Sequence, residues 1–255
     1  AGSLTLLDTL SLSNSAALNS TGGTITLGSG ASVPSGTSIS LPDTTLVLEN
    51  DLSLTGGTLK TKNTTFTTNS NALSLSDSSI LEVEGVQDLS GVLPDNSVTL
   101  RLAADSTVNT DASLSFGTLD LANNALTLDD GMAGLSVAQA VTLDAAGEQI
   151  LTGNADLTLN GGISVTAGAF SSTGGALTLP SGATLVSGST FTTSDTTIHL
   201  GGSLAVADTW TSTDTSVLLT GNVSLSSTEE MSLATLDTNG YGLQLASATS
   251  DLIIT

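Results

Sequence analysis

The residues in this sequence that could do chemistry are mainly carboxylates, because the 255-residue chain has 24 Asp and Glu, only 3 Lys and Arg, and 1 His. Grouped carboxylates with a nearby cation could act as general acid and base on a polysaccharide. The acids form loose groups: Asp43, Glu49 and Asp51; Glu82, Glu84 and Asp88; Asp129 and Asp130; Asp195, Asp208 and Asp214. The cations Lys60, Lys62 and Arg101 look scattered along the chain. We therefore interpret the acids as solvated turn residues, propose no catalytic residue and expect no enzymatic activity.

Calcium is the metal that such acids would favour, since Ca²⁺ binds carboxylate and carbonyl oxygens in turns. The candidate Ca²⁺ ligands are Asp129, Asp130, Asp195 and Asp214. The glycine-rich nonapeptide that binds Ca²⁺ in some β-helices is not present, so a specific site competes with diffuse counterion binding. The only histidine, His199, alternates with Ile198 and Leu200 and is expected to face outward. We expect no metal bound through histidine and no other cofactor.

Threonine offers a second kind of surface. Dense rows of Thr occur at Thr64, Thr65, Thr67 and Thr68, at Thr190, Thr192, Thr193, Thr196 and Thr197, and at Thr209, Thr211, Thr213 and Thr215. The last two rows lie about one repeat apart, and the surface-binding candidates are Thr192, Thr193, Thr211 and Thr213. Flat Thr-rich faces bind ice in several solenoid proteins, but Ser and Thr are the default outward residues throughout this chain. Binding to an ice or mineral surface is therefore an alternative function.

These side chains must be positioned by a repeat of about 20 residues, in which apolar residues return to the same places. In the second half the ladders are Ile150, Phe170, Phe191, Trp210, Met231 and Leu252; Leu157, Leu177, Ile198, Val217 and Leu236; and Ile163, Leu185, Leu204, Val223 and Leu243. In the first half they are Leu4, Ile25, Leu46 and Phe66; Leu12, Val33, Leu54 and Leu75; and Leu18, Ile39, Leu59 and Ile80. Three ladders per repeat indicate three strands per coil of a β-solenoid.

Strand and turn signals agree with this reading. Apolar and polar residues alternate in stretches such as Leu157-Thr158-Leu159, which is the period of a strand with one buried face. Gly-Gly pairs such as Gly161-Gly162 supply turns between the strands. The sequence thus predicts an all-β fold, a parallel β-helix with three short strands and 20–21 residues per coil, and division of the 255 residues gives about twelve coils.

We expect one continuous solenoid over residues 1–255, with irregular coils or loop excursions near 82–105 and 129–148. The apolar pairs crowd and charge is denser in the first of these stretches. The second contains the most helix-tolerant piece of the chain, around residues 131–140, where we expect a short bulge on the flank.

Composition limits the partners. The formal net charge of −21 disfavours nucleic acid, because binding phosphates requires clustered cations. No apolar run approaches the ~18 residues of a membrane helix, so membrane insertion is not expected. Cysteine is absent, which excludes disulfides and thiolate metal sites. With no signal peptide at its start, the chain is expected to be a mature or excised segment of a larger exported protein.

The whole chain resembles the Ser-, Thr-, Gly- and Asn-rich repeats of bacterial exported proteins, namely filamentous-haemagglutinin-like adhesins and autotransporter passenger domains. The likeness lies in the repeat length, in Leu-Thr-Leu strands and in turns such as Asn160-Gly161-Gly162. It implies a right-handed parallel β-helix, an extracellular or cell-surface location and work as an adhesin, stalk or fibre.

The predicted function is therefore that of a stiff, acidic, non-enzymatic extracellular rod. Both ends of the sequence follow the repeat pattern without a polar cap, so we expect self-association end to end, in which coils of neighbouring molecules stack. A cell-surface or matrix polysaccharide or protein is a further possible partner. A polysaccharide-active β-helix enzyme is the remaining alternative, and it requires a carboxylate group to meet Arg101 or Lys60 in a groove.

Overall fold

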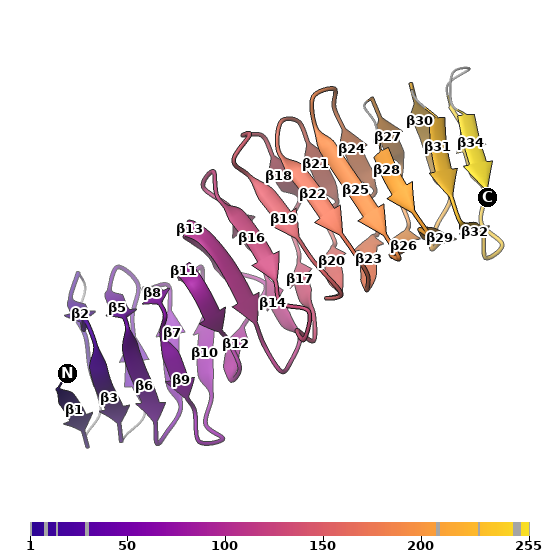
Figure 1. Cartoon of the computed structure of the whole chain (residues 1–255). Helices are drawn as coiled ribbons and strands as arrows, with labels where there is room; N and C mark the ends of the chain where they lie inside the picture. The colour runs from indigo at the N-terminus through magenta and orange to yellow at the C-terminus, as the bar shows by residue number, and fades with distance from the viewer. Residues whose placement is uncertain are drawn as a thin grey trace. The chain divides into compact units, whose positions relative to one another are not determined.

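The computed structural model is an all-β parallel β-solenoid of about 11 coils with about 21 residues per turn (Figure 1). It describes residues 2–7, 10–13, 15–28, 31–207, 210–228, 230–246 and 251–254, and within these ranges there are strands and turns but no helix. None of the described segments could therefore cross a membrane as a helix. The chain divides into two compact units, residues 1–122 and residues 123–255. That they form one continuous solenoid stays a prediction of the repeat.

The first unit contains three parallel sheets, each named here by its first strand. The β1 sheet has the order β1 (Ser3–Leu6), β3 (Gly23–Leu27), β6 (Thr44–Leu48), β9 (Thr65–Thr67). The β4 sheet has the order β4 (Ala31–Val33), β7 (Leu52–Thr55), β10 (Leu73–Ser76), β12 (Val92–Pro94). The β2 sheet has the order β2 (Ala17–Asn19), β5 (Ser38–Pro42), β8 (Thr58–Lys62), β11 (Ile80–Asp88), β13 (Thr99–Asn109), with β15 (Thr118–Asp120) also beside β13. The strand β14 (Leu114–Phe116) belongs to the same unit.

The second unit repeats the three-sheet plan. The β16 sheet has the order β16 (Ala125–Leu128), β19 (Gln149–Leu151), β22 (Ala169–Ser172), β25 (Thr190–Ser194), β28 (Trp210–Thr213). The β17 sheet has the order β17 (Leu135–Val137), β20 (Leu157–Leu159), β23 (Ala176–Leu179), β26 (Thr197–Leu200), β29 (Ser216–Leu219), β32 (Thr235–Asp237). The β18 sheet has the order β18 (Val141–Leu143), β21 (Ile163–Val165), β24 (Ala183–Leu185), β27 (Leu204–Val206), β30 (Val223–Ser227), β33 (Leu243–Leu245). The strands β31 (Glu230–Leu233) and β34 (Asp251–Ile254) pair with each other.

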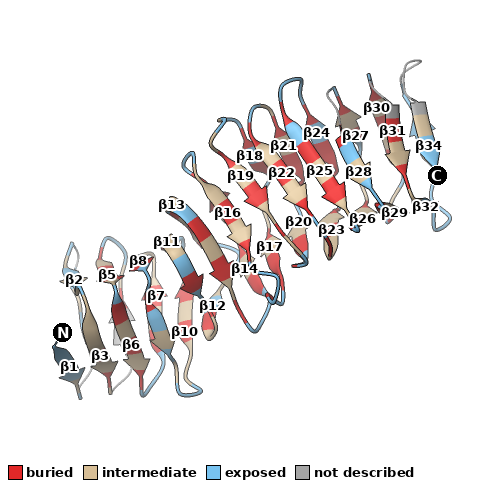
Figure 2. Cartoon of the chain, viewed as in Figure 1, coloured by how far each residue is buried: buried red, intermediate tan, exposed pale blue. Residues whose placement is uncertain are grey.

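Inside each unit the core is a stack of the predicted ladders, and buried residues alternate with half-buried ones along the strands (Figure 2). Phe170 pairs in register with Ile150 on one side and with Phe191 on the other, and Phe191 pairs with Trp210. The rings of Phe170 and Phe191 stack with centroids 4.8 Å apart, and Trp210 meets Phe191 edge-on at 5.8 Å. Both geometries are favourable for aromatic pairs. This ladder is therefore interior, as the sequence predicted.

Two predicted ladders are wrong in register. Ile163 pairs with Ala183 and not with Leu185, and Leu204 pairs with Leu225 and not with Val223. The reason is the two-residue period of a strand: residues two apart share the inner face, so spacing alone does not separate them. In the first unit Leu59 pairs with Leu81, whereas the predicted Ile80 lies on the outer side of its strand.

The two stretches expected to be irregular contain strands, and the first of them is also irregular in register. Over residues 82–105 the chain forms much of the long strands β11 and β13, with a shift of register between Val83 and Gly85. Over residues 129–148 it forms β17 and β18 with turns between them and no helix, so the helix-tolerant piece adopts the local solenoid structure. The step from Leu126 to its partner Ile150 is 24 residues (150 − 126), and such longer coils reduce the number of coils from twelve to about 11.

Glycine turns stack in neighbouring coils where the backbones approach closely. Gly162 and Gly182 have φ of 81° and 88°, which favours glycine. A Cβ atom at Gly161, the first residue of the pair Gly161-Gly162, would lie 2.1 Å from the backbone nitrogen of Ala140, so no other residue fits there without movement of the backbone. The Gly-Gly turn signal in the sequence therefore has a steric cause as well as a conformational one.

Candidate functional site

All three cations of the sequence lie on the outer face of the β2 sheet. Lys60 and Lys62 are on β8 and Arg101 is on β13, with β11 between these strands. Cross-strand neighbours follow one another in the order Lys60, Glu82, Arg101 and Asp120. A second row pairs Lys62 with Glu84. Because outward residues two apart on a strand stay on one face, the two rows lie side by side. We call these six residues the charged ladder.

The charges of the ladder alternate in sign and pair directly. Lys60 Nζ lies 3.0 Å from Glu82 Oε1, and Arg101 Nε donates a hydrogen bond to Asp120 Oδ2 at 2.8 Å. Lys62 Nζ donates to Glu84 Oε1. Exposed pairs of this kind contribute little to stability because water screens them, and each of the three joins two neighbouring strands. The ion pairs of the charged ladder therefore link each coil to the next one.

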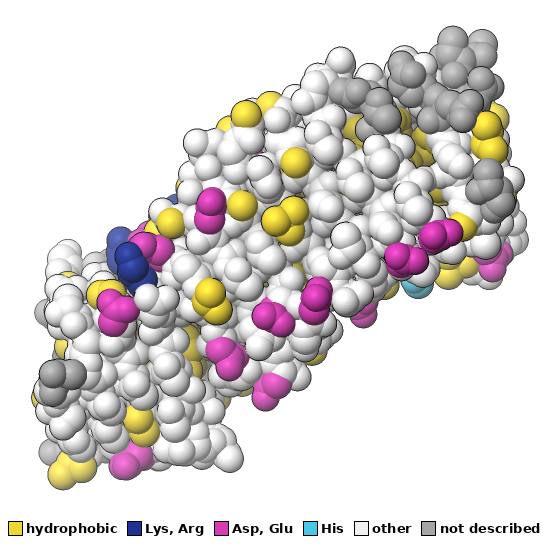
Figure 3. Space-filling model, viewed as in Figure 1, with side chains coloured by type: hydrophobic (Ala, Val, Ile, Leu, Met, Phe, Trp, Pro, Cys, Tyr) yellow, Lys and Arg dark blue, Asp and Glu magenta, His cyan; other side chains and the backbone are white. Residues whose placement is uncertain are grey.

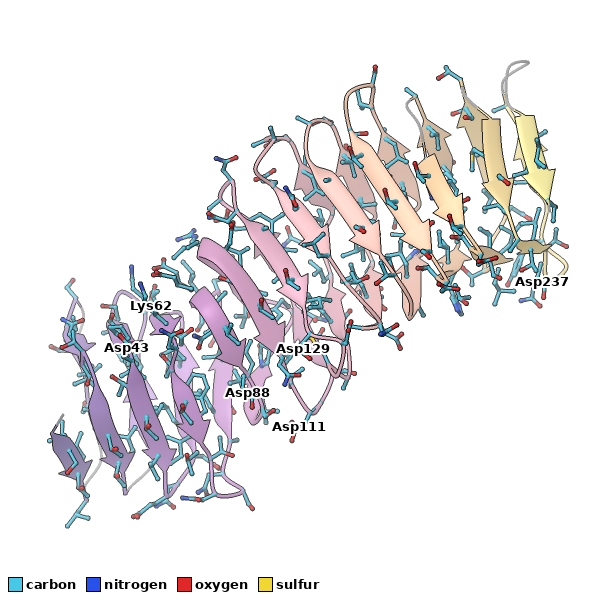
Figure 4. The ribbon with its side chains drawn as sticks, in the orientation of Figure 1. Asp43, Lys62, Asp88, Asp111, Asp129 and Asp237 are labelled. Carbon is cyan, nitrogen blue, oxygen red and sulfur yellow. The ribbon has the colours of Figure 1, made fainter. Side chains whose placement is uncertain are left out.

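Lys62 interacts with two carboxylates, those of Glu84 and Asp43. The hydrogen bond to Glu84 and the charge of Glu84 raise the pKa of Lys62 above its ordinary value of 10.5, and the charge of Asp43 adds to the effect. Figure 4 shows Lys62 and Asp43 near each other at one corner of the coils. Asp43 is oriented by the side-chain amide of Asn63, whose Nδ2 donates to Asp43 Oδ1 at 3.0 Å. Lys62 thus stays charged at every physiological pH.

A shallow groove of about 160 Å³ lies along the charged ladder. It is lined by Ser40, Pro42, Lys60, Thr61, Lys62, Glu82, Glu84 and Ala103. Ligand pockets for small molecules usually measure about 300–1,000 Å³, so this groove is too small to enclose a sugar ring and its neighbours. Its walls are also the ion-paired side chains themselves. The groove offers a surface for contact and no enclosed site.

The sequence interpretation of the cations as scattered was wrong. The steps from Lys60 to Glu82, Arg101 and Asp120 are 22, 19 and 19 residues, which are single coils (82 − 60, 101 − 82, 120 − 101). The repeat length was thus the signal that could have aligned these charges.

The candidate calcium ligands Asp129 and Asp130 lie in the exposed turn after β16, and one carboxylate oxygen of each accepts a hydrogen bond from the backbone. Asp129 Oδ1 accepts from the backbone N–H of Gly131 at 3.1 Å. Asp130 Oδ1 accepts from the backbone N–H of Asn154 in the next coil at 3.0 Å. These contacts are typical of structural Asp residues in turns.

Asp195 and Asp214 occupy equivalent exposed turns of successive coils, each with φ of 50°. The next residue in each turn, Thr196 or Thr215, is buried, and its hydroxyl donates to the backbone carbonyl two residues earlier. Asp tolerates the left-handed conformation, which explains its place in this turn. Within the described residues, no group of three or more His, Cys, Asp or Glu side chains could hold a metal ion. Asp208, the third acid of the predicted group, lies outside the described residues.

Thr193 is fully buried, so its assignment as a surface-binding residue was wrong. It follows Thr192 on β25, and neighbouring residues on a strand point to opposite faces. Its Oγ1 accepts a hydrogen bond from Trp210 Nε1 at 2.9 Å and lies 2.9 Å from Thr215 Oγ1. This threonine stabilises the corner of the coil and cannot meet a ligand in solution.

The other predicted threonines form only a short surface row. Thr192 pairs in register with Thr211, but Thr192 is preceded in the row by Ser171 and Leu151. Thr213 pairs with Ser194. His199 lies on the outer side of β26 between Thr178 and Leu218, as its alternation predicted. The second unit therefore presents mixed outward residues, and the array expected there does not extend beyond two coils.

A larger groove of about 580 Å³ lies in the first unit beside β9 and β12. Its wall includes Phe66, Leu93 and Pro94, and its polar groups include Asp51, Asp111 and several Ser and Thr hydroxyls. Figure 4 shows Asp111 at the lower edge of the coils. Asp51 is held in place because its Oδ1 accepts from the backbone N–H of Ala72 at 2.8 Å. A lining of apolar side chains, one aromatic residue and several hydroxyls suits contact with an uncharged saccharide.

A comparison of the chain with protein-family models, with curated proteins and with solved structures finds no match to any of them.

Proposed function

We propose that the protein is a non-enzymatic extracellular structural and adhesive protein of the filamentous-haemagglutinin-like or autotransporter-passenger type. The observation that carries this proposal is the charged ladder: every Lys and Arg of the chain pairs with a carboxylate on a neighbouring strand. The chain thus uses its few cations to join coils. Links between neighbouring coils stiffen the stack of coils, as a structural scaffold requires.

The alternative of a polysaccharide-active enzyme required carboxylates and cations to meet in a groove. Lys60 and Glu82 do meet there, but as a direct ion pair 3.0 Å apart on adjacent strands. A general acid and base must instead reach a substrate with free oxygens. The acids of the ladder are engaged with cations, so we propose no catalytic residue.

Adhesion would use the lateral groove beside β9 and β12. Its volume of about 580 Å³ lies within the range of small-molecule pockets, and its lining has no Lys or Arg. A neutral cell-surface or matrix polysaccharide fits this chemistry better than an acidic one. The extracellular location itself is proposed from the composition that the chain shares in style with exported bacterial repeats.

Assembly would use the strands at the two outer coils. Among the described strands, β1 pairs only with β3 and β34 only with β31, so each keeps one side free for pairing. Apolar side chains on these strands are exposed, with Leu4 at 44% and Ile254 at 54%. Stacking can continue there with further coils of a longer chain or with a second copy, and we propose the second for the 255-residue chain.

Electron microscopy and sedimentation of the purified chain, with and without a calcium chelator, test the assembly. Fibres are expected in the wild type, and a double variant L4K/I254K should disperse them by placing charges on both outer coils. The matched control is L93K, because Leu93 is also 54% exposed but lies on the lateral face. If the chelator disperses the fibres, Ca²⁺ bound by the acidic turn residues bridges neighbouring molecules.

Isolated molecules under all conditions would remove the fibre proposal. Equal dispersal by L93K and by L4K/I254K would instead show that any added charge acts through solubility. Binding of neutral glycans, lost in a variant F66A, would remain as evidence for adhesion without assembly.

A further inference from the structure

The outer face of the β1 sheet carries two parallel ranks of hydroxyl side chains across four successive strands. Cross-strand register gives the first rank as Ser3, Thr24, Thr45 and Thr65. It gives the second rank as Thr5, Thr26, Val47 and Thr67. The pattern on each strand is thus Thr-x-Thr with two exceptions, Ser3 and Val47. We call these eight positions the threonine face.

The threonine face is regular in both directions. The four strands pair in parallel with no shift of register, unlike β11 and β13. Ranks are separated by two residues along each strand, or about 6.7 Å, and strands by about 4.8 Å. Hydroxyl and methyl groups therefore recur at two fixed spacings over this face. The apolar residues between them, such as Ile25 and Leu46, are buried and fix the strands against the core.

Composition alone does not explain this face. The β4 sheet has the same buried leucines, but its outward positions carry Ser53 and Ser74 in one rank and Thr55 and Ser76 in the next. Threonine differs from serine by a γ-methyl group, which restricts χ1 and makes the side chain stiff. A stiff array of methyl and hydroxyl groups can hold water in fixed positions. Serine presents the hydroxyl without that restriction.

The threonine face carries no charge, although the chain has a formal net charge of −21. The nearest acids in sequence, Asp43 and Glu49, lie just outside the strand β6 and are exposed at its two ends. Figure 3 shows the surface over β3 and β6 mostly in white, the colour of uncharged polar side chains and backbone. A face that binds an ionic mineral would carry carboxylates at the eight positions of the threonine face. A face that orders water carries hydroxyl and methyl groups there.

We propose that the threonine face binds ice. Its ranks would order water into the adjoining lattice, and the many weak contacts would act together because the sheet fixes all of them at once. The site differs from the Thr192 and Thr211 row, which spans two coils. The proposal does not depend on the proposed adhesive function, since it uses a lateral face and a dispersed molecule.

The test is thermal hysteresis together with enrichment of the protein in slowly grown ice. The wild type should show both, and T26K/T45K should reduce each at least tenfold. The matched control S53K/S74K places the same two charges at outward positions of the β4 sheet and should retain both activities. Circular dichroism and the melting temperature check that all variants fold.

A second variant tests the regularity of the threonine array without adding charge. V47T completes the second rank and should keep or raise the hysteresis. Absence of hysteresis and of enrichment in the wild type would overturn the proposal. Retention of activity in T26K/T45K, or a fall in V47T with its fold intact, would do the same. Fibre formation is measured separately by microscopy. A negative result for one proposal therefore does not affect the test of the other.

Discussion

At the scale of single residues, the side of the strand decides whether a threonine is structural or exposed. Thr193 and Thr215 face inward and their hydroxyls bond to each other, and Thr193 also accepts from Trp210, whereas Thr192 faces outward. A buried hydroxyl without a partner costs free energy, so the bond between Thr193 and Thr215 stabilises the corner of the coil. The exposed Asp residues of the same corners are there for their backbone conformation.

The pair T193V and T192V separates these two roles. T193V removes the acceptor of the Trp210 N–H and is expected to lower the free energy of unfolding by about 1–3 kcal/mol. T192V makes the same chemical change on the outer face and should stay within about 0.5 kcal/mol. Denaturant titration followed by Trp210 fluorescence measures both. Equal effects would contradict the buried bond.

Lys62 provides a pH-dependent prediction. Its pKa in the folded protein is raised above 10.5 by Glu84, so the ion pair stabilises the fold fully below pH 10.5. This contribution is lost as pH rises through the folded-state pKa. NMR titration of the Lys62 side chain should give a pKa above 10.5, and E84Q should move it back toward that value. An unchanged pKa in E84Q would show that another group causes the shift.

At the scale of the strand, register decides which apolar residue is core. Leu81 is fully buried and pairs with Leu59, whereas its neighbour Ile80 faces outward. The same register places Lys60, Glu82 and Arg101 beside one another on the outer side. A shift by one residue would exchange the two faces and bury the charges, which fixes the alignment strongly.

Replacing Leu81 and Ile80 separately by alanine tests this register. L81A is expected to cost about 2–5 kcal/mol, because it removes a buried side chain and leaves a cavity. I80A changes a half-buried outward residue and should cost about 1 kcal/mol or less. Thermal or denaturant unfolding by circular dichroism compares them. A larger effect of I80A would mean that the strand is turned the other way.

At the scale of the whole molecule, each coil contacts its neighbours only, so stability is local. The acids repel one another, and the described cations offset them only at the charged ladder. Local stability implies that damage in one unit need not unfold the other. It also implies that a single spectroscopic probe reports the coils around it.

F191A tests this locality. Removing the ring between Phe170 and Trp210 is expected to cost about 3–5 kcal/mol in the second unit. The midpoint of the Trp210 fluorescence transition should then fall below the midpoint of circular dichroism. L59A, in the first unit, should lower the dichroism midpoint without moving that of Trp210. Coincident transitions in both variants would show one cooperative unit.

The sequence by itself determined the solenoid, its three strands per coil and the inward or outward side of most residues. It could do so because strand alternation and a constant repeat are local regularities, visible in spacing. Only the tertiary structure decided which of two inward neighbours pair, such as Ile163 with Ala183, because both fit the same period. The structure also decided what lies side by side on the outer faces. The charged ladder and the threonine face join residues one coil apart, and their alignment depends on the length of each turn.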